Sequence, residues 1–206
     1  MNNILITQKF FIDERKRLTW FLEKNWFKFF EKKGIKLVPL NPYSFKRKKL
    51  LSLNPKALIL TGGNDLYDVI KLRGNLIRDK YERNILNFAI KNKIPILAIC
   101  RGFQFVAKFF KCKIFKIINH VRTTHNLKVD DKIFKFKIEK FNVNSYHNYA
   151  IYELPKHFNF IIRHSDNSIE LAKTSKYKIL CLMFHPERQN RSQRIINKII
   201  FSHLKI

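Results

Sequence analysis

Hydrophobic residues along this chain form short, wholly apolar runs that alternate with longer stretches in which apolar residues recur every three to four positions. The short runs are typical of buried strands, and the longer stretches are typical of amphipathic helices. Strands are predicted at residues 3–7, 35–40, 57–60, 94–100 and 178–184, and helices at 17–34, 77–93, 101–110 and 190–204. This alternation predicts an α/β fold in which a mostly parallel central sheet is flanked by helices.

The second half of the chain adds a different pattern. Residues 132–141, 158–164 and 168–173 alternate apolar and polar side chains. Such segments are typical of more exposed antiparallel or edge strands, so we expect a small antiparallel sheet beside the parallel one. Neither a repeat nor a linker interrupts the 206 residues, and we predict a single domain over residues 1–206.

The composition and the N-terminal sequence indicate where the protein functions and which groups it binds. The longest apolar runs fall far short of the roughly 18 residues that a membrane span needs. The N-terminus lacks the pattern of a signal peptide, so we expect a cytoplasmic protein with no membrane partner. Cys100, Cys112 and Cys181 form no CxxC pair, which argues against a disulfide framework and a cysteine zinc site. No metal-ligand spacing is present, and neither a metal nor a cofactor is expected.

The formal net charge of +27 is open to two interpretations. It could attract nucleic acid, an anionic membrane or a phosphate-bearing small molecule. The lysines are nevertheless spread along the chain, and no helix-turn-helix, zinc-finger or RNA-binding aromatic motif accompanies them. We therefore expect mainly solvated surface lysines and no specific nucleic-acid partner. The positive charge is also compatible with an anionic small substrate.

Cys100 lies where a predicted strand passes directly into a predicted helix, in the stretch "PILAICRGFQF". A tight strand-to-helix turn with a following glycine is the layout of a nucleophile elbow. The helix N-terminus there favours the thiolate, and the next backbone N–H can face a developing oxyanion. A buried core cysteine is the alternative, and this segment alone leaves the two interpretations even.

His185 and Glu187 follow the buried run 178–184 in the sequence "FHPE". Pro186 favours an extended backbone at His185, and in an extended chain the side chains of His185 and Glu187 project to the same side. A carboxylate so placed can orient an imidazole, and a cysteine nucleophile needs an oriented base. Their joint placement at the end of a strand therefore favours a catalytic Cys100.

Gly62 and Gly63 follow another buried run in "LTGGND". Two glycines let backbone N–H groups approach a substrate carbonyl, which would supply the second half of an oxyanion hole. On its own the pair could equally form a tight loop.

Together, "TGGND", "AICRGFQF", "VNSYHNYAI" and "FHPER" resemble the class I glutamine amidotransferase superfamily over nearly the whole chain. Arg78, Asp79 and Glu82 in "RD..E", with the "CRG.Q" form of the elbow, resemble most its γ-glutamyl hydrolase branch. The resemblance implies a flavodoxin-like class I glutamine amidotransferase fold and cysteine-dependent hydrolysis of a γ-glutamyl amide.

The resemblance also implies roles for individual residues. Cys100 would be the nucleophile, His185 the general base and acid, and Glu187 its orienting partner. The backbone N–H groups of Gly63 and Arg101 would form the oxyanion hole. The implied substrate-binding residues are Gly62, Gln104, Asn144, Ser145, Tyr146 and His147.

Two positions depart from the usual family pattern. Ala98 stands two residues before the cysteine, where a glycine is usual, and Met183 replaces a glutamine before "FHPE". A glycine pair often found after the elbow helix is also absent, and the chain is shorter than typical γ-glutamyl-γ-aminobutyrate hydrolases. Ala98 should still permit the strand, whereas any contact by the replaced glutamine side chain is lost. The shorter length puts the γ-aminobutyrate substrate in doubt.

The sequence does not identify the leaving group on the γ-glutamyl nitrogen. If it is ammonia, the chain is a glutaminase subunit that serves a separate synthase; if it is a larger amine or amidate, the chain is a stand-alone hydrolase that needs no synthase partner. The second is favoured, and the compact, lysine- and phenylalanine-rich chain resembles branch members whose leaving group carries a pyrophosphate. Arg73, Arg78, Arg101 and Arg122 are candidates for a basic rim that would hold such a group. A silent scaffold protein and a nucleic-acid-binding protein are the rivals from other classes.

Overall fold

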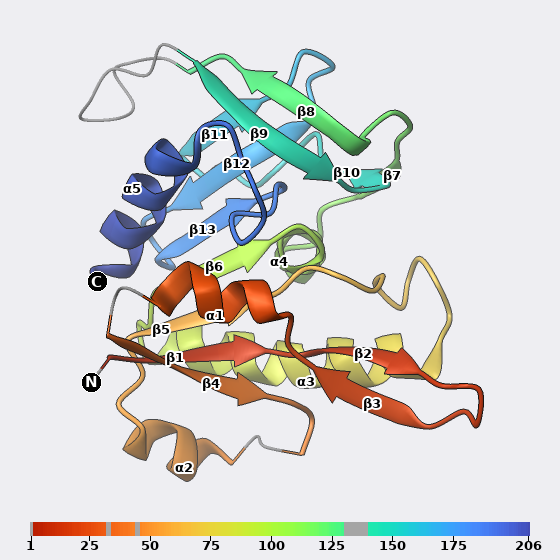
Figure 1. The fold of residues 1–206 in the computed structure, drawn as a ribbon, viewed down its shortest axis with the longest axis vertical. Helices are drawn as coiled ribbons and strands as arrows, with labels where there is room; N and C mark the ends of the chain where they lie inside the picture. The colour runs from red at the N-terminus through yellow and green to blue at the C-terminus, as the bar shows by residue number, and fades with distance from the viewer. Residues whose placement is uncertain (1, 32–33, 44–45, 130–139) are drawn as a thin grey trace.

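Seven strands form the central sheet of the computed structural model, which describes residues 2–31, 34–43, 46–129 and 140–206 (Figure 1). Their order across the sheet is β11 (Phe160–Arg163), β12 (Ile169–Thr174), β13 (Ile179–Leu182), β6 (Ile96–Ile99), β5 (Ala57–Leu60), β1 (Asn2–Thr7) and β4 (Ile35–Leu40). The five strands from β13 to β4 are parallel, whereas β12 and β11 continue the sheet antiparallel at one edge.

Two apolar layers cover the two faces of this sheet. Successive residues of β5 alternate between them: Leu58 and Leu60 belong to one layer, and Ala57 and Ile59 to the other. The first layer includes residues of α2 (Arg47–Ser52), α3 (Arg73–Lys91) and α4 (Arg101–Phe109), and the second includes residues of α1 (Lys24–Phe30) and α5 (Gln193–Leu204). The predicted α/β fold, with helices on both faces of a mostly parallel sheet, is confirmed.

Three two-stranded antiparallel sheets complete the described fold. They are β2 (Lys9–Ile12) with β3 (Leu18–Phe21), β7 (Phe115–Lys116) with β10 (Tyr149–Ala150), and β8 (Val121–Leu127) with β9 (Phe141–Tyr146). The β8–β9 pair lies at one end of the molecule, beside β11 and β12 (Figure 1). None of the helices among the described residues is long and apolar enough to cross a membrane.

The helix predicted over residues 17–34 is only partly correct. Residues 18–21 form β3, and the helix begins at Lys24. The reason is tertiary packing: the ring of Trp20 lies 5.5 Å from that of Phe10 on β2 and 5.8 Å from that of Tyr81 on α3. These contacts fix an extended backbone that the local hydrophobic spacing does not show.

The alternating segments of the second half also need one correction. β12 was expected to be rather exposed, yet most of its residues are buried, including Glu170. The cause is that Glu170 faces His125 and His147, which belong to the β8–β9 region that covers it. Of the strand predicted over 132–141, all but the last two residues lie outside the described residues, and Phe141 begins β9.

Candidate active site

Cys100 lies between β6 and α4 with the backbone angles of a strained turn. Its φ of 49° and ψ of −105° are rare for a residue with a side chain. The backbone N–H of Cys100 donates to the Leu182 carbonyl at 2.7 Å, and its carbonyl accepts from the N–H of Gln104 at 3.0 Å. A Cβ atom at position 102 would lie 2.3 Å from the Leu60 carbonyl oxygen, so the elbow requires Gly102. The geometry is that of the predicted nucleophile elbow.

His185 and Glu187 meet beside this cysteine. The Nδ1 atom of His185 lies 2.7 Å from the Oε1 atom of Glu187, and both side chains are buried. His185 also forms a side-chain hydrogen bond with Cys100. Burial alone would lower the pKa of His185, but the Cys100 thiolate and the Glu187 carboxylate raise it to about 10. The three side chains therefore have the arrangement of a nucleophile, a base and the carboxylate that orients the base.

Asn144 holds the backbone of the same histidine. Its Oδ1 accepts from the His185 N–H at 2.9 Å, and its Nδ2 donates to the His185 carbonyl at 2.9 Å and to the Gln189 carbonyl at 3.1 Å. These bonds use the amide that was predicted to contact substrate. The position of Asn144 instead fits a residue that orients the histidine loop.

Gly62 and Gly63 lie against the catalytic side chains. A Cβ at Gly62 would be 2.6 Å from Cε1 of His185 and 3.4 Å from Cβ of Cys100, so only glycine fits there. Gly63 has a φ of +77°. Arg78 lies behind this turn and donates to the carbonyl oxygens of Thr61, at 2.9 Å, and of Gly63. With those carbonyl oxygens bound by Arg78, the N–H groups of the turn are left to face a substrate at the cysteine.

The "RD..E" residues form a buried ionic network rather than a basic rim. Arg78 Nε donates to Glu82 at 2.9 Å, and Arg101 contacts both Glu82 and Asp79. Arg78, Glu82 and Arg101 are almost completely buried. Burial would raise the pKa of Glu82, but Arg101 and Arg78 lower it below its ordinary value. The side chains of Arg78 and Arg101, predicted as rim candidates, are therefore occupied inside the protein.

The backbone of Arg101 remains suited to its predicted role. It is the first residue of α4, and the first N–H groups of a helix have no partner within the helix. The oxyanion hole of Gly63 and Arg101 stays a prediction that this geometry supports.

The remaining predicted substrate residues lie in different environments. Tyr146 is 38% exposed, and its ring centroid is 5.9 Å from that of His185. Gln104 is buried and donates to the Tyr149 carbonyl at 3.1 Å. Ser145 is fully buried and donates to the His120 carbonyl at 2.6 Å, and His147 is buried toward Glu170. Tyr146 is therefore placed beside the catalytic histidine, whereas the side chains of Ser145 and His147 are committed elsewhere.

The cations that the structure describes around the site include Lys9, Arg122, Arg188 and Arg191, and of these Arg122 alone was predicted from the sequence. Lys9 and Arg188 both contact the carboxylate of Glu23, Arg188 at 3.6 Å. Lys9 lies over Gly63, since a Cβ there would be 2.7 Å from the lysine Cδ. The guanidinium carbon of Arg188 lies 4.7 Å from the ring centroid of Tyr146. The predicted Arg122 is exposed and lines a hollow of about 310 Å³ together with Tyr146 and Arg191. Arg73, the fourth rim candidate, is exposed at the start of α3.

The comparison with known proteins bears on this geometry. The family model described as "Glutamine amidotransferase class-I" matches residues 22–203. The chain belongs to the class I glutamine amidotransferase family. It is 37% identical to the γ-glutamyl-CDP-amidate hydrolase of Campylobacter jejuni over 73% of this chain and 72% of that protein. It is 31% identical to one subunit of the glutamine-hydrolyzing GMP synthase of Pyrococcus abyssi, over 66% of this chain and 68% of that one.

Solved structures agree with the fold. A glutamine amidotransferase from Thermotoga maritima superposes with a TM-score of 0.68 at 21% identity, over 100% of this chain and 86% of that one. A proposed GMP synthase subunit from Thermoplasma acidophilum gives a TM-score of 0.73 at 20% identity, over 100% of this chain and 94% of that one. The predicted fold class and the prediction of an amidohydrolase of glutamine amidotransferase type are confirmed.

Proposed function

We propose that this amidotransferase-type hydrolase cleaves a γ-glutamyl amide through a thioester on Cys100. One observation carries the proposal. Side-chain hydrogen bonds connect Cys100, at the end of β6, with His185 and Glu187, which follow β13 in a separate motif. A cysteine with an oriented histidine is the arrangement that nucleophilic catalysis requires.

The first half-reaction transfers the glutamyl group to the enzyme. The Cys100 thiolate attacks the γ-carbonyl carbon, and the carbonyl oxygen takes the negative charge, which the N–H groups of Gly63 and Arg101 stabilise. The His185 imidazolium then gives its proton to the amide nitrogen. The C–N bond breaks, the amine or amidate leaves, and a glutamyl thioester remains.

The second half-reaction restores the enzyme. Neutral His185 takes a proton from water, whose oxygen attacks the thioester carbon. The C–S bond then breaks, which releases L-glutamate and regenerates the thiolate of Cys100 beside the imidazolium. Glu187 holds the same imidazole tautomer in both steps through its contact with Nδ1.

For the leaving group we propose cytidine diphosphoramidate, as the product of γ-glutamyl-CDP-amidate hydrolysis that would supply phosphoramidate for capsule modification. Two observations support this choice. A relative 37% identical to this chain is named for that substrate, and the hollow beside Tyr146 is lined by Arg122 and Arg191, whose positive charge would stabilise a pyrophosphate there.

A second candidate is a glutaminase subunit that passes ammonia to a separate synthase, which the likeness to the GMP synthase subunit of Pyrococcus abyssi favours. A third is hydrolysis of γ-glutamyl-γ-aminobutyrate. The test is to offer γ-glutamyl-CDP-amidate, γ-glutamyl-γ-aminobutyrate and glutamine separately and to compare kcat/KM for glutamate release. We expect a clear preference for the CDP-amidate. A preference for glutamine, above all one stimulated by an added synthase, would overturn the proposed leaving group.

A further inference from the structure

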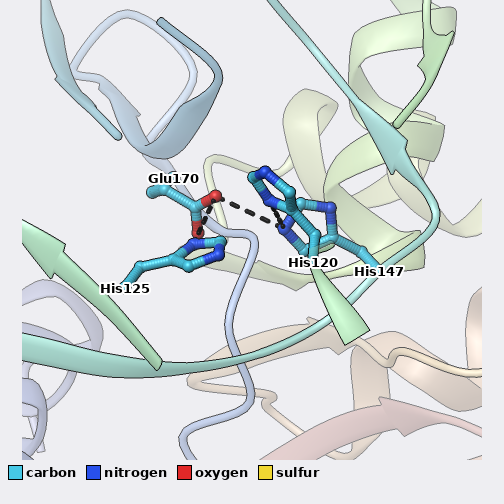
Figure 2. A group of neighbouring side chains, drawn as sticks. All are labelled: His120, His125, His147 and Glu170. Carbon is cyan, nitrogen blue, oxygen red and sulfur yellow. Dashed lines mark hydrogen bonds and ion pairs between the residues drawn. The ribbon is translucent and has the colours of Figure 1, made fainter. Parts of the chain in front are cut away.

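Four buried side chains converge outside the proposed active site: His120, His125, His147 and Glu170 (Figure 2). They come from distant parts of the chain. His125 belongs to β8 and Glu170 to β12, while His120 precedes β8 and His147 follows β9. One ligand atom from each residue lies within 4.8 Å of one atom from every other. Sequence spacing predicted no metal site because no two of the four form a recognisable local motif.

The distances within this group, which we call the His3Glu cluster, have the spacing of a metal's coordination shell. Oε1 of Glu170 lies 3.1 Å from Nδ1 of His125 and 3.3 Å from Nε2 of His147, and that Nε2 lies 3.4 Å from Nδ1 of His120. Four ligands at about 2.0–2.1 Å from a tetrahedral Zn²⁺ would be about 3.3–3.4 Å apart. These three separations surround that value, and the other ligand-atom pairs lie within 4.8 Å.

The outer contacts turn lone pairs toward the centre of the cluster. Nε2 of His120 lies 2.8 Å from Asp166, and Nδ1 of His147 lies 3.1 Å from the Tyr149 carbonyl oxygen. Both partners are acceptors, so each of these nitrogens carries a proton. The opposite nitrogens of the two rings face each other at 3.4 Å with Glu170 beside them, so at most one of the two can carry a proton. A metal ion between these atoms would satisfy all of them at once.

The other two members are short of partners. Both carboxylate oxygens of Glu170 and both ring nitrogens of His125 are buried without a well-aligned hydrogen bond to any residue that the structure describes. A buried polar group without a partner is costly, and a buried carboxylate especially so.

From this geometry we propose that the His3Glu cluster binds one divalent transition-metal ion, with Zn²⁺ as the preferred occupant. Three imidazoles and one carboxylate are ligands suited to zinc, and neutral imidazole with an ordered outer partner is the form that zinc binds. All four positions are filled by protein, as in structural zinc sites.

The proposed ion would stabilise the segment between β9 and β10, which lies beside Gln104 and Asn144 of the proposed substrate site. The Tyr149 carbonyl that orients His147 also accepts from Gln104 of the elbow helix, and the His120 carbonyl accepts from Ser145, next to Asn144. An ion bound by His120 and His147 would therefore fix both ends of the β9–β10 connection. Its effect would be on pocket geometry and stability, since none of its four ligands is placed at Cys100.

The first test needs no variant and no substrate. Tag-free wild-type protein is treated with a chelator, titrated with Co²⁺ or Zn²⁺, and examined by absorption spectroscopy and elemental analysis. We expect one ion per chain, an intense visible cobalt spectrum of tetrahedral type, and a higher Tm with zinc than without. Failure to retain either ion, with an unchanged Tm, would overturn the proposal and leave a proton shared between His147 and Glu170 as the occupant.

Variants then locate the ion. Glu170→Gln and His125→Ala should abolish stoichiometric zinc, and Asp166→Asn should weaken zinc affinity by about 10- to 100-fold, as loss of an outer partner does. His203→Asn is the matched control, because its Nε2 contacts the Ile96 carbonyl in another part of the fold. Full zinc retention by folded Glu170→Gln would contradict the assignment. Failure of this test leaves γ-glutamyl hydrolysis untouched.

Discussion

Arg101 and Glu82 form an ion pair that is fully buried directly behind the nucleophile elbow. Arg78 binds the other oxygen of the same carboxylate and also the carbonyl oxygens of the Gly62–Gly63 turn. One carboxylate thus connects the two segments whose N–H groups are proposed to form the oxyanion hole. The residues of the "RD..E" pattern therefore hold the elbow and the Gly62–Gly63 turn in position. An anionic leaving group would have to be bound by other cations.

Removing the charge of Glu82 should destabilise the protein strongly. Glu82→Gln leaves two buried guanidinium groups incompletely compensated, and loss of one partner of a buried pair costs about 3–5 kcal/mol. Denaturant unfolding measures this free energy, with the exposed Glu14→Gln as the matched control, which should change it by less than about 0.5 kcal/mol. Equal stability of the two variants would contradict the network.

Asn144 should matter through the histidine that it holds. Asn144→Ala removes the acceptor of the His185 N–H and the donor to its carbonyl, so the imidazole loses its fixed position relative to Cys100. We expect kcat to fall about 100-fold with a much smaller change in KM, since misplacement of a catalytic group has effects of this order. A large rise in KM with kcat unchanged would instead support the direct substrate contact predicted from the sequence.

The charge on Cys100 should be visible in the titration of His185. The histidine pKa is about 10, above its ordinary value of about 6.5, so the stability that this shift contributes is fully present below pH 6.5 and is lost as the pH rises through 10. Cys100→Ala removes the thiolate and should lower the His185 pKa. NMR titration of the imidazole in both proteins measures this, and equal pKa values would contradict the ion pair.

The cations at the site edge should affect one substrate selectively. Arg122→Gln should raise KM for γ-glutamyl-CDP-amidate by about 10-fold, a loss of about 1.4 kcal/mol that fits one charge-assisted contact. Glutamine turnover should change much less, because it lacks the phosphates. Arg15→Gln, at an exposed position, is the control. Equal effects on both substrates would show that the leaving group does not bind at this cation.

The sequence was sufficient for the central sheet and the catalytic trio because both depend on local signals. Apolar runs such as residues 96–99 are buried on both faces, and Cys100, His185 and Glu187 follow such runs. Neighbouring parallel strands bring their carboxyl ends together, so these residues could be expected to meet.

Other features depend on contacts that no local pattern records. The first part of the helix expected at residues 17–34 forms β3 instead, because Trp20 packs on Phe10 and Tyr81. The roles predicted for Ser145 and His147 depend on which way β9 and its following turn face, and that is set by pairing with β8. The His3Glu cluster arises from the same pairing, which brings histidines far apart in sequence onto one buried glutamate.

The central claim is that Cys100 carries out the hydrolysis, and glutamate release by Cys100→Ala tests it most directly. Wild-type protein and this variant are each supplied with γ-glutamyl-CDP-amidate, γ-glutamyl-γ-aminobutyrate and glutamine, and L-glutamate is measured over time. We expect wild-type turnover of at least one of the three, and a fall of about 10⁴-fold or more in the variant, as for loss of other catalytic nucleophiles. Unchanged glutamate release by folded Cys100→Ala would contradict the account.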